Sequence, residues 1–298
     1  MNILVTGASG LIGSALVEWL HNRGDRALAL RRAVGAARSE GPSWNPERGS
    51  IDLKSAGRLD AVVHLAGETI AQRWTPEAQA RIRSSRVEGT QLLCKALGQL
   101  DPKPRVLVSA SAVGFYGDRG NELLDEDSSG GSGFLADTAR GWEGATEPAM
   151  TAGIRVVHLR IGIVLTPKGG ALARMLPVFR LGLGGRLGSG QQYWSWISLD
   201  DLLRAIAFAL DTTSLTGPVN AVSPGVVTNR EFTRLLARAL ARPALLPVPG
   251  FAVKVLLGEM GSEALLGSTR TAPARLVRAG FTFHHAELGA ALEAMLPR

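Results

Sequence analysis

Near its start the chain reads Asn2-Ile3-Leu4-Val5-Thr6-Gly7-Ala8-Ser9-Gly10-Leu11-Ile12-Gly13. An apolar run that passes through a glycine-rich turn into a helical pattern is typical of dinucleotide-binding domains. Gly7 would permit the tight turn, Gly10 would let the backbone approach a pyrophosphate, and Gly13 would allow the helix to pack closely on the strand. The helix N-terminus offers free N–H groups to the phosphates. The stretch therefore predicts a nucleotide loop, although its G-x-x-G-x-x-G spacing is one residue longer at its start than the usual fingerprint.

The next 150 residues alternate short apolar runs with longer amphipathic stretches. Expected strands are Asn2–Thr6, Arg26–Leu30, Ala61–Leu65, Arg105–Ser109 and Arg155–Leu159. Expected helices between them are Gly10–Arg23, Pro76–Leu100 and Leu135–Ala152. This alternation favours βαβ units, and the continuously apolar runs are typical of strands buried on both faces. We predict an α/β fold with a Rossmann-type, doubly wound parallel sheet.

The composition and hydrophobic pattern of the sequence change after Thr166. Residues 167–192 are rich in glycine, and an apolar period from Asp200 to Leu210 predicts a helix. Further helices are expected at Ala171–Leu181, Asn229–Ala241, Pro249–Leu257, Ala272–Ala279 and Ala286–Leu296. We expect a nucleotide-binding domain over residues 1–165, to which residues 197–222 return, and a smaller, mainly helical substrate lobe over residues 166–298.

Composition excludes several classes of protein. The 298 residues are 45% apolar and the net charge is only +7, which excludes a mainly disordered chain. No run of about 18 apolar residues predicts a membrane span, and the N-terminus lacks the basic region of a secretory signal. The single cysteine, Cys94, excludes an internal disulfide and a multi-cysteine metal site. The arginines are scattered, which argues against nucleic acid. We expect a cytoplasmic protein with no metal, no membrane partner and no nucleic-acid partner.

The end of the second expected strand indicates which dinucleotide binds. An NAD site needs a carboxylate there, to accept a hydrogen bond from the ribose 2′-hydroxyl. This chain has Arg31 and Arg32 instead. Two guanidinium groups suit a 2′-phosphate, although a solvated basic turn is the simpler alternative. We therefore predict NADP(H) as the cofactor.

Several motifs in order carry a family resemblance along nearly the whole chain. They are the glycine loop, Leu65-Ala66-Gly67-Glu68, Ser85-Arg86-Val87, Gly114-Phe115-Tyr116-Gly117, Gly188-Ser189-Gly190-Gln191, Trp196-Ile197-Ser198-Leu199-Asp200-Asp201 and Gly280-Phe281-Thr282-Phe283. With them the chain resembles the extended short-chain dehydrogenase/reductases. It is most similar to the atypical members called NAD-dependent epimerase family proteins, which are sugar nucleotide epimerase-like and end in a small domain.

The resemblance implies a set of cofactor contacts. They fall on Gly7, Ser9, Gly10, Leu11, Ile12, Gly13, Arg31, Arg32, Leu65, Ala66, Gly67, Arg86, Ser109 and Val164. Arg86 stands where most extended members have an asparagine, and in this subfamily an arginine there is directed to the cofactor. These positions follow the rule that ligands bind beyond the carboxyl ends of the strands.

The family's usual acid/base pair is missing from this sequence. These enzymes use a tyrosine whose pKa is lowered by a lysine four residues later. Here Tyr116 is followed four residues on by Gly120, and Tyr193 by Ile197. Aligning the expected helix on Glu143 places Leu135 at the tyrosine position and Ala139 at the lysine position.

Ser111 and Tyr116 are the remaining catalytic candidates. Ser111 follows the central strand, where the family's serine would donate a hydrogen bond to a substrate carbonyl. Tyr116 would help to orient the substrate, although packing in a strand–loop turn is its other interpretation. Glu68 and Asp137 are alternative proton carriers, and either could equally be a helix cap or a surface charge. His64 fits a packed, neutral histidine better than a catalytic one.

The substrate itself is not identified by the sequence. Trp194 stands near the place of the arginine that grips the diphosphate in sugar-nucleotide epimerases, and Trp196 follows two residues later. Two indoles suit an apolar or planar substrate, and equally a packed core. We predict an NADP(H)-binding epimerase or oxidoreductase that acts on an unidentified small molecule as a monomer or homodimer. The alternative is a non-catalytic NADP(H)-binding sensor or regulatory module.

Overall fold

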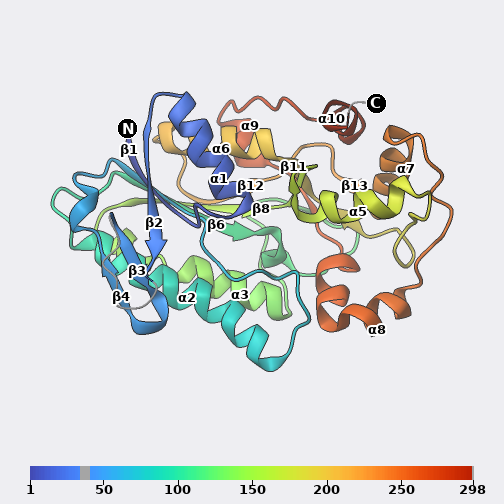
Figure 1. Cartoon of the computed structure of the whole chain (residues 1–298), viewed down its shortest axis with the longest axis horizontal. Coiled ribbons are helices and arrows are strands. Elements are labelled where there is room, and N and C mark those ends of the chain that lie inside the picture. Colours follow the sequence, from blue (N-terminus) through green and yellow to red (C-terminus); the bar gives the residue numbers. More distant parts are fainter. Residues whose placement is uncertain (34–40, 297–298) are drawn as a thin grey trace.

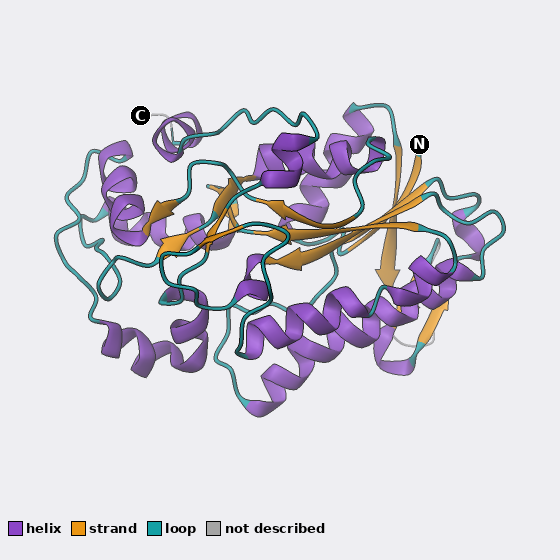
Figure 2. Cartoon of the chain, turned by 180° about the vertical axis from the view of Figure 1, so that it is seen from behind, coloured by secondary structure: helices purple, strands orange, loops and turns teal. Residues whose placement is uncertain are grey.

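The computed structural model, which describes residues 1–33 and 41–296, is built around one eight-stranded sheet (Figures 1 and 2). In spatial order its strands are β12 (Gly217–Ala221), β8 (Arg155–Ile161), β6 (Val106–Ala112), β5 (Ala61–His64), β1 (Asn2–Thr6), β2 (Arg26–Arg32), β3 (Ser43–Asn45) and β4 (Ser50–Asp52). All neighbouring strands pair in parallel except β3 and β4. The predicted doubly wound, Rossmann-type α/β fold is confirmed.

Helices cover both faces of this sheet and also build most of the C-terminal part. They are α1 (Leu11–Asn22), α2 (Pro76–Gly98), α3 (Phe134–Gly144), α4 (Glu147–Thr151), α5 (Gly170–Arg180), α6 (Leu199–Asp211), α7 (Asn229–Ala239), α8 (Gly250–Met260), α9 (Ala274–Arg278) and α10 (Leu288–Met295). In Figure 1, α1 and α6 lie above the sheet, and α2 and α3 lie below it. None of the helices in the described ranges is both long and apolar enough to cross a lipid bilayer.

Strand side chains alternate between two cores, as the pleat requires. Ile3 and Val5 pack in the core under α1 and α6, whereas Leu4 packs in the core over α2. Val62 and Leu107 continue the second core. Burial of both strand faces explains why these segments are continuously apolar in sequence.

The order of the strands defines where the sheet's crevice opens. The chain first adds β2 beside β1, and after the β3–β4 hairpin it crosses over to add β5 on the other side of β1. Ligands of doubly wound sheets bind at such a reversal, beyond the carboxyl ends of the two strands. Here these ends lead into Gly7 and Leu65.

The main differences from the expected elements concern one helix and the edges of the sheet. The helix expected over Leu135–Ala152 is two helices, α3 and α4, because Pro148 cannot continue a helix through its missing N–H. The β3–β4 hairpin and β12 were not among the expected strands. The sequence of β12, Gly-Pro-Val-Asn-Ala, carries little strand propensity, and its pairing with β8 places it in the sheet.

The C-terminal part has a third core and three short strand pairs. Its core joins α5, α7 and α10 around Trp194 and Trp196. The short pairs are β10 (Tyr193–Trp194) with β13 (Val227–Thr228), β11 (Trp196–Ser198) with β9 (Ile163–Thr166), and β14 (Arg270–Thr271) with β7 (Leu123–Leu124). Two elements from beyond residue 165 nevertheless pack with the large sheet, since β12 pairs with β8 and α6 lies against α1.

Candidate functional site

The glycine loop forms a tight backbone turn between β1 and α1. Gly7 has a φ of +66°, which a side chain would strain, and its carbonyl accepts a hydrogen bond from the N–H of Gly10 at 2.9 Å. Gly10 then precedes α1 and has no side chain with which to cap the free N–H groups of the helix. Ser9 and Gly10 are exposed, whereas Leu11 and Ile12 are half-buried. The turn therefore presents bare backbone N–H groups at a helix N-terminus.

Gly13 lets α1 begin directly above this turn. A Cβ at Gly13 would lie 2.1 Å from the carbonyl oxygen of Gly7, which is far inside van der Waals contact. We expect Gly13→Ala to lower the free energy of unfolding by about 1–3 kcal/mol, as overpacking does. Gly144→Ala is the matched control, because Gly144 also lies in a helix and a Cβ there meets nothing within 4 Å. Urea denaturation of both variants tests the expectation, and equal stabilities would contradict it.

A buried histidine joins the glycine loop to the end of β5. The Thr6 hydroxyl oxygen accepts hydrogen bonds from the N–H groups of Leu65 and Ala66, both at 3.1 Å, and contacts His64 Nδ1 at 2.7 Å. The Thr6 proton therefore points to Nδ1, so that Nε2–H donates to the Thr90 hydroxyl at 2.8 Å. A Cβ at Gly7 would come within 3 Å of this same Leu65–Ala66 backbone. His64 is thus a packed, neutral histidine.

Burial, together with the positive charge of Arg86, lowers the pKa of His64 to about 4. The unfolded chain takes up a proton at this histidine below about pH 6.5, whereas the folded chain does so only near pH 4. We therefore expect the free energy of unfolding to fall as the pH drops from 6.5 to 4, and the fall to be smaller in His64→Asn. His21→Asn, a change at an exposed histidine of α1, should keep the wild-type slope. Identical pH profiles for His64→Asn and the wild type would refute this.

Arg31 and Arg32 end β2, the neighbour of β1 in the sheet. Both side chains are exposed. The backbone N–H of Arg31 donates to Pro42 O at 3.1 Å, and the two residues pair with Ser43 and Trp44 of β3. Two guanidinium groups are therefore carried by regular strand backbone beside the glycine loop.

Arg86 lies on α2 against the loop that follows β5. Its Nη1 donates to the carbonyls of Glu68 at 2.9 Å and Ile82 at 3.1 Å, and its guanidinium stacks over Trp142 at 4.9 Å. Burial lowers the pKa of Arg86 to about 10, which leaves the group charged at neutral pH. Gly67 makes room for it, because a Cβ there would lie 3.2 Å from the guanidinium carbon.

Two further expected cofactor residues lie within strands. Ser109 is buried inside β6, and its hydroxyl approaches Ala110 O at 3.4 Å. Val164 is half-buried in β9, whose following turn reaches back to the glycine loop. At that turn a Cβ on Gly169 would lie 2.8 Å from the Leu11 side chain. The segment after β9 therefore closes over the start of α1.

A buried polar network surrounds Ser111 at the end of β6. The Ser111 hydroxyl donates to Glu143 Oε1 at 2.7 Å. Arg160, from β8, clasps the same carboxylate with Nε at 2.8 Å and Nη2 at 2.9 Å. Burial acts to lower the pKa of Arg160, but its hydrogen bonds and attraction to Glu143 raise it above the ordinary value. The Ser111 hydroxyl is therefore aimed at a carboxylate that is itself fixed in place.

Tyr116 belongs to the same network. Its side chain is fully buried, its hydroxyl donates to Asn220 Oδ1 at 2.8 Å, and it accepts from Arg160 Nη1 at 3.0 Å. Burial raises the pKa of the phenol despite the neighbouring guanidinium. This geometry favours the packing interpretation of Tyr116 over direct contact with a substrate.

Most residues of this network were not expected from the sequence to belong to the site. Glu143 was used only as the reference point for aligning the expected helix, and Asn220 lies on a strand that was not expected. The one available signal was the position of Glu143, one helical turn after Ala139, which turns its side chain toward β6.

The structure also decides between the two interpretations of Trp194 and Trp196. Both are buried in the third core, where they donate to backbone carbonyls, and neither lines either of the two cavities described below.

The C-terminal part touches α3 through one carboxylate. Glu263 lies in the π-helical turn Gly261–Leu265, and its oxygens accept from the N–H groups of Phe134 at 3.0 Å and Leu135 at 2.9 Å. Gly133, with a φ of +107°, allows this approach. The helix that carries Glu143 is thereby capped by the C-terminal part.

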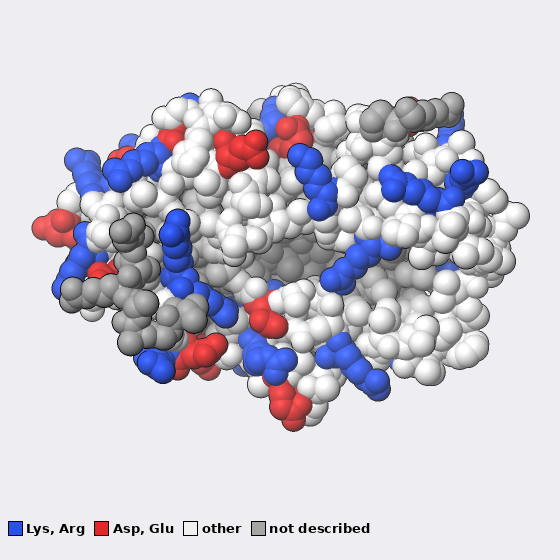
Figure 3. All heavy atoms as spheres, viewed as in Figure 1, with Lys and Arg blue, Asp and Glu red and all other residues white. Residues whose placement is uncertain are grey.

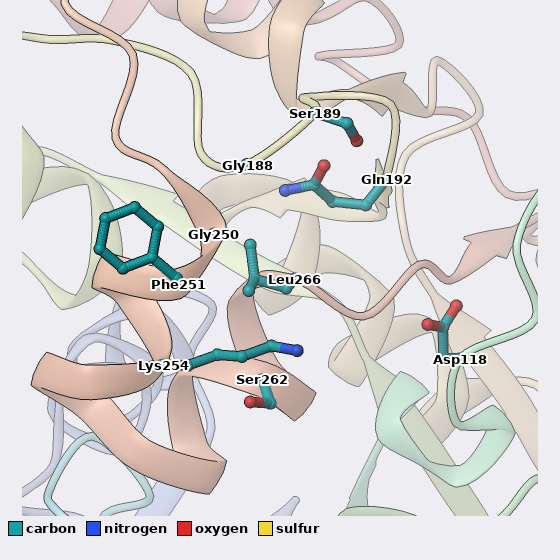
Figure 4. A pocket seen from close by; sticks show the side chains of 9 residues that line it. All are labelled: Asp118, Gly188, Ser189, Gln192, Gly250, Phe251, Lys254, Ser262 and Leu266. Atoms are coloured by element: carbon teal, nitrogen blue, oxygen red, sulfur yellow. The ribbon is translucent and has the colours of Figure 1, made fainter.

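A cavity of about 570 Å³ opens beside this turn (Figure 4). Its lining is Asp118, Gly188, Ser189, Gln192, Gly250, Phe251, Lys254, Ser262 and Leu266. Figure 4 shows Ser189 and Gln192 on one side and Lys254 and Ser262 on the other. A second cavity of about 460 Å³ shares Asp118, Gln192 and Leu266 with it. The lining offers hydroxyl, amide and charged groups together with two apolar side chains, a mixture suited to a small polar molecule.

Comparisons with known proteins match nearly the whole chain. The model of the NAD dependent epimerase/dehydratase family matches residues 3–222, and that of a domain of unknown function (DUF1731) matches residues 248–295. The chain is 46% identical to Epimerase family protein Mb2239 of Mycobacterium bovis, over 97% of this chain and 96% of that protein. It is 37% identical to Epimerase family protein SDR39U1 of Homo sapiens, over 98% and 99%.

Solved structures are similar over the same range. The crystal structure of human epimerase family protein SDR39U1 (isoform2) with NADPH has a TM-score of 0.90 at 36% identity, with 99% of each chain covered. UDP-glucose 4-epimerase of Thermus thermophilus, in complex with NAD, has a TM-score of 0.74 at 22% identity, with 99% of this chain and 98% of that chain covered. The second likeness concerns the fold alone.

Proposed function

Because the chain belongs to the NAD dependent epimerase/dehydratase family, we propose that it is an NADP(H)-dependent epimerase or oxidoreductase acting on a small molecule. The observation that carries the proposal is the meeting of three features at one edge of the sheet. They are the glycine loop under α1, the Leu65–Ala66 backbone packed on it, and the two exposed arginines at the end of β2. The human SDR39U1 structure with NADPH supports the choice of cofactor.

The geometry of the chain fits such a dinucleotide. The cradle at Gly7 and Gly13 leaves no room for a Cβ, and α1 presents free N–H groups to phosphate. Arg31 and Arg32 would hold the 2′-phosphate by charge-assisted hydrogen bonds. The backbone at Leu65–Gly67 would line the adenosine half, and Arg86, Ser109 and Val164 would lie along the remainder. When bound, NADP(H) would supply or accept a hydride.

Ser111 and Glu143 would handle the proton in place of the missing tyrosine. Because the Ser111 hydroxyl already donates to Glu143 at 2.7 Å, its oxygen is left to accept the proton of a substrate hydroxyl. In an oxidation Ser111 would take up that proton at Oγ while its own proton passes to Glu143 Oε1. In a reduction the same protons would move in the opposite direction. Arg160 would hold Glu143 in line for this transfer.

Tyr116 would act as a positioning residue. Its hydroxyl links Arg160 to Asn220, and Asn220 in turn donates to Ala272 O at 2.9 Å. Tyr116 would thus fix the guanidinium that clasps Glu143, without touching the substrate. The expected role of Tyr116 in orienting the substrate becomes an indirect one.

A non-catalytic NADP(H)-binding sensor or regulatory module is the second candidate. It is favoured by one specific observation, namely that the buried hydroxyl of Tyr116 is already engaged by two partners. Leu135 and Ala139 stand on α3 at the positions that the alignment gives to tyrosine and lysine. A protein with this fold and no proton carrier would bind the cofactor without turning it over.

One experiment separates the enzyme from the sensor. Metabolite pools are added to the protein with NADPH, and NADPH fluorescence is followed. We expect NADPH to be oxidised only when a pool that contains the substrate is added. The rate of this oxidation should fall at least 100-fold in Ser111→Ala, because general acid–base groups contribute about that much to the rate. Ser50→Ala, a change at an exposed serine of β4, should leave the rate unchanged. An epimerase returns its hydride and leaves NADPH fluorescence unchanged, so the NMR spectrum of each pool is recorded as well. NADPH binding with neither oxidation nor a change in any pool would favour the sensor, and full activity in Ser111→Ala would contradict the proton relay.

A further inference from the structure

Exposed apolar side chains gather at one end of the molecule. Eleven large apolar residues are markedly exposed in the described ranges, and eight of them come from the end of α5, two neighbouring loops and α8. We call these eight the apolar end: Val178, Leu181, Leu183, Leu245, Leu246, Phe251, Val255 and Leu256. Isolated exposed apolar residues need no explanation, but a gathering of this kind marks an interaction surface.

The segments of the apolar end lie side by side. A Cβ at Gly182 would contact the Pro243 ring at 3.3 Å, and one at Gly185 would overlap the carbonyl of Leu246. Leu187 and Val248 form a parallel bridge that continues the contact toward α8. Figure 1 places α8 at the lower right of the molecule, where the surface in Figure 3 is mainly white and shows no acidic atoms.

The same segments carry an excess of positive charge. Residues 171–199 and 235–260, which include all of α8, contain six lysines and arginines and one acidic residue, the exposed Glu259. Exposed cations among the six are Arg174, Arg180, Arg238, Arg242 and Lys254. Lys254 follows Phe251 by three positions on α8, so that the two side chains share a face. The exposed cations beside the apolar end therefore outnumber the acidic residues.

We propose that the apolar end docks this protein on an anionic lipid bilayer. Helix α8 is apolar around most of its circumference, and Val253 is its one buried side chain among the described residues. Its exposed side chains Phe251, Val255 and Leu256 would enter the headgroup region, while the long cationic side chains beside them keep their charges at the level of the headgroups. Anionic headgroups attract each adjacent lysine or arginine.

A second copy of the chain is the less favourable occupant of this surface. A two-fold interface would place the same patch against itself, and thus the same cations against one another. The expectation of no membrane partner rested on the absence of a spanning run, which a helix lying on the surface does not need. Phe251 and Lys254 also line the larger of the two cavities, so docking would place the opening of this cavity beside the lipid headgroups.

Vesicle co-sedimentation tests the proposal directly. The probes are vesicles of phosphatidylglycerol and phosphatidylcholine in equal parts, and vesicles of phosphatidylcholine alone. We expect binding to the anionic vesicles at least tenfold tighter, and weaker in 0.5 M salt, because each cation near the surface contributes about fivefold. Arg180→Gln/Arg242→Gln/Lys254→Gln should remove this preference. Arg48→Gln/Lys54→Gln/Arg105→Gln, exposed changes outside these two segments, should keep it.

The apolar contribution has its own matched pair of variants. Phe251→Ser/Val255→Ser/Leu256→Ser should lose at least tenfold in vesicle binding. Leu123→Ser/Met150→Ser/Val277→Ser, which changes the other three exposed apolar residues, should bind as the wild type does. Melting curves verify that both proteins are folded. Equal binding by the two triple variants overturns the proposal. The proposal is also overturned if light scattering shows a dimer for the wild type and a monomer only for the Phe251/Val255/Leu256 variant. That result would assign the surface to a second copy of the chain.

Discussion

Arg160→Met is expected to lower the free energy of unfolding by about 3–5 kcal/mol, the usual result of breaking a buried ion pair from one side. The side chains of Arg160 and Glu143 are only 4% and 12% exposed, and two hydrogen bonds join them. Methionine keeps much of the aliphatic stem but leaves the Glu143 carboxylate and the Tyr116 hydroxyl without their shared donor. Guanidinium denaturation at pH 7 measures the loss.

Arg234→Met is the matched control for this experiment. Arg234 also clasps a glutamate, Glu231, with two nitrogens, but the two side chains are 58% and 41% exposed. An exposed pair is screened by solvent and contributes little to stability, so the loss should be much smaller. The double variant Glu143→Leu/Arg160→Met should recover part of the lost stability, since no charge is then buried alone. If Arg160→Met and Arg234→Met lowered the free energy of unfolding equally, the buried network around Glu143 would not be stabilising the site.

The central sheet could be predicted because its signals are local. Residues Asn2–Thr6 and the first turn of α1 are fixed by an apolar run and three glycines, and the structure reproduces that strand with the same bounds. The long α2 likewise begins at the expected proline, where the Thr75 hydroxyl accepts from the N–H of Ala78. Elements of this kind depend on neighbours in the sequence, so a single sequence suffices.

The proton network could not be predicted because its members are distant in sequence. Ser111, Glu143 and Arg160 come from three different elements, and only the parallel pairing of β6 with β8 brings Ser111 opposite Arg160. The burial of Tyr116 depends on Asn220, which lies on a strand without a recognisable pattern. The two tryptophans show the same limit, because whether an indole faces a ligand or a core is decided by tertiary packing.

Arg31→Ala/Arg32→Ala is expected to weaken NADPH binding by about 100-fold or more, while NADH binding changes little. Hydrogen bonds to charged groups contribute about 1.5–3 kcal/mol each, and NADH has no 2′-phosphate to receive them. Arg26→Ala is the matched control, because Arg26 is an exposed arginine at the opposite end of the same strand. It should leave both affinities unchanged.

The ratio of the two dissociation constants, for NADH over NADPH, tests the NADP(H) assignment most directly. Fluorescence titration of the wild type and of the two β2 variants supplies it. We expect a ratio of about 100 or more for the wild type and for Arg26→Ala, and a ratio near 1 for Arg31→Ala/Arg32→Ala. A wild-type ratio that persists unchanged in Arg31→Ala/Arg32→Ala would contradict the assignment of these arginines to the 2′-phosphate.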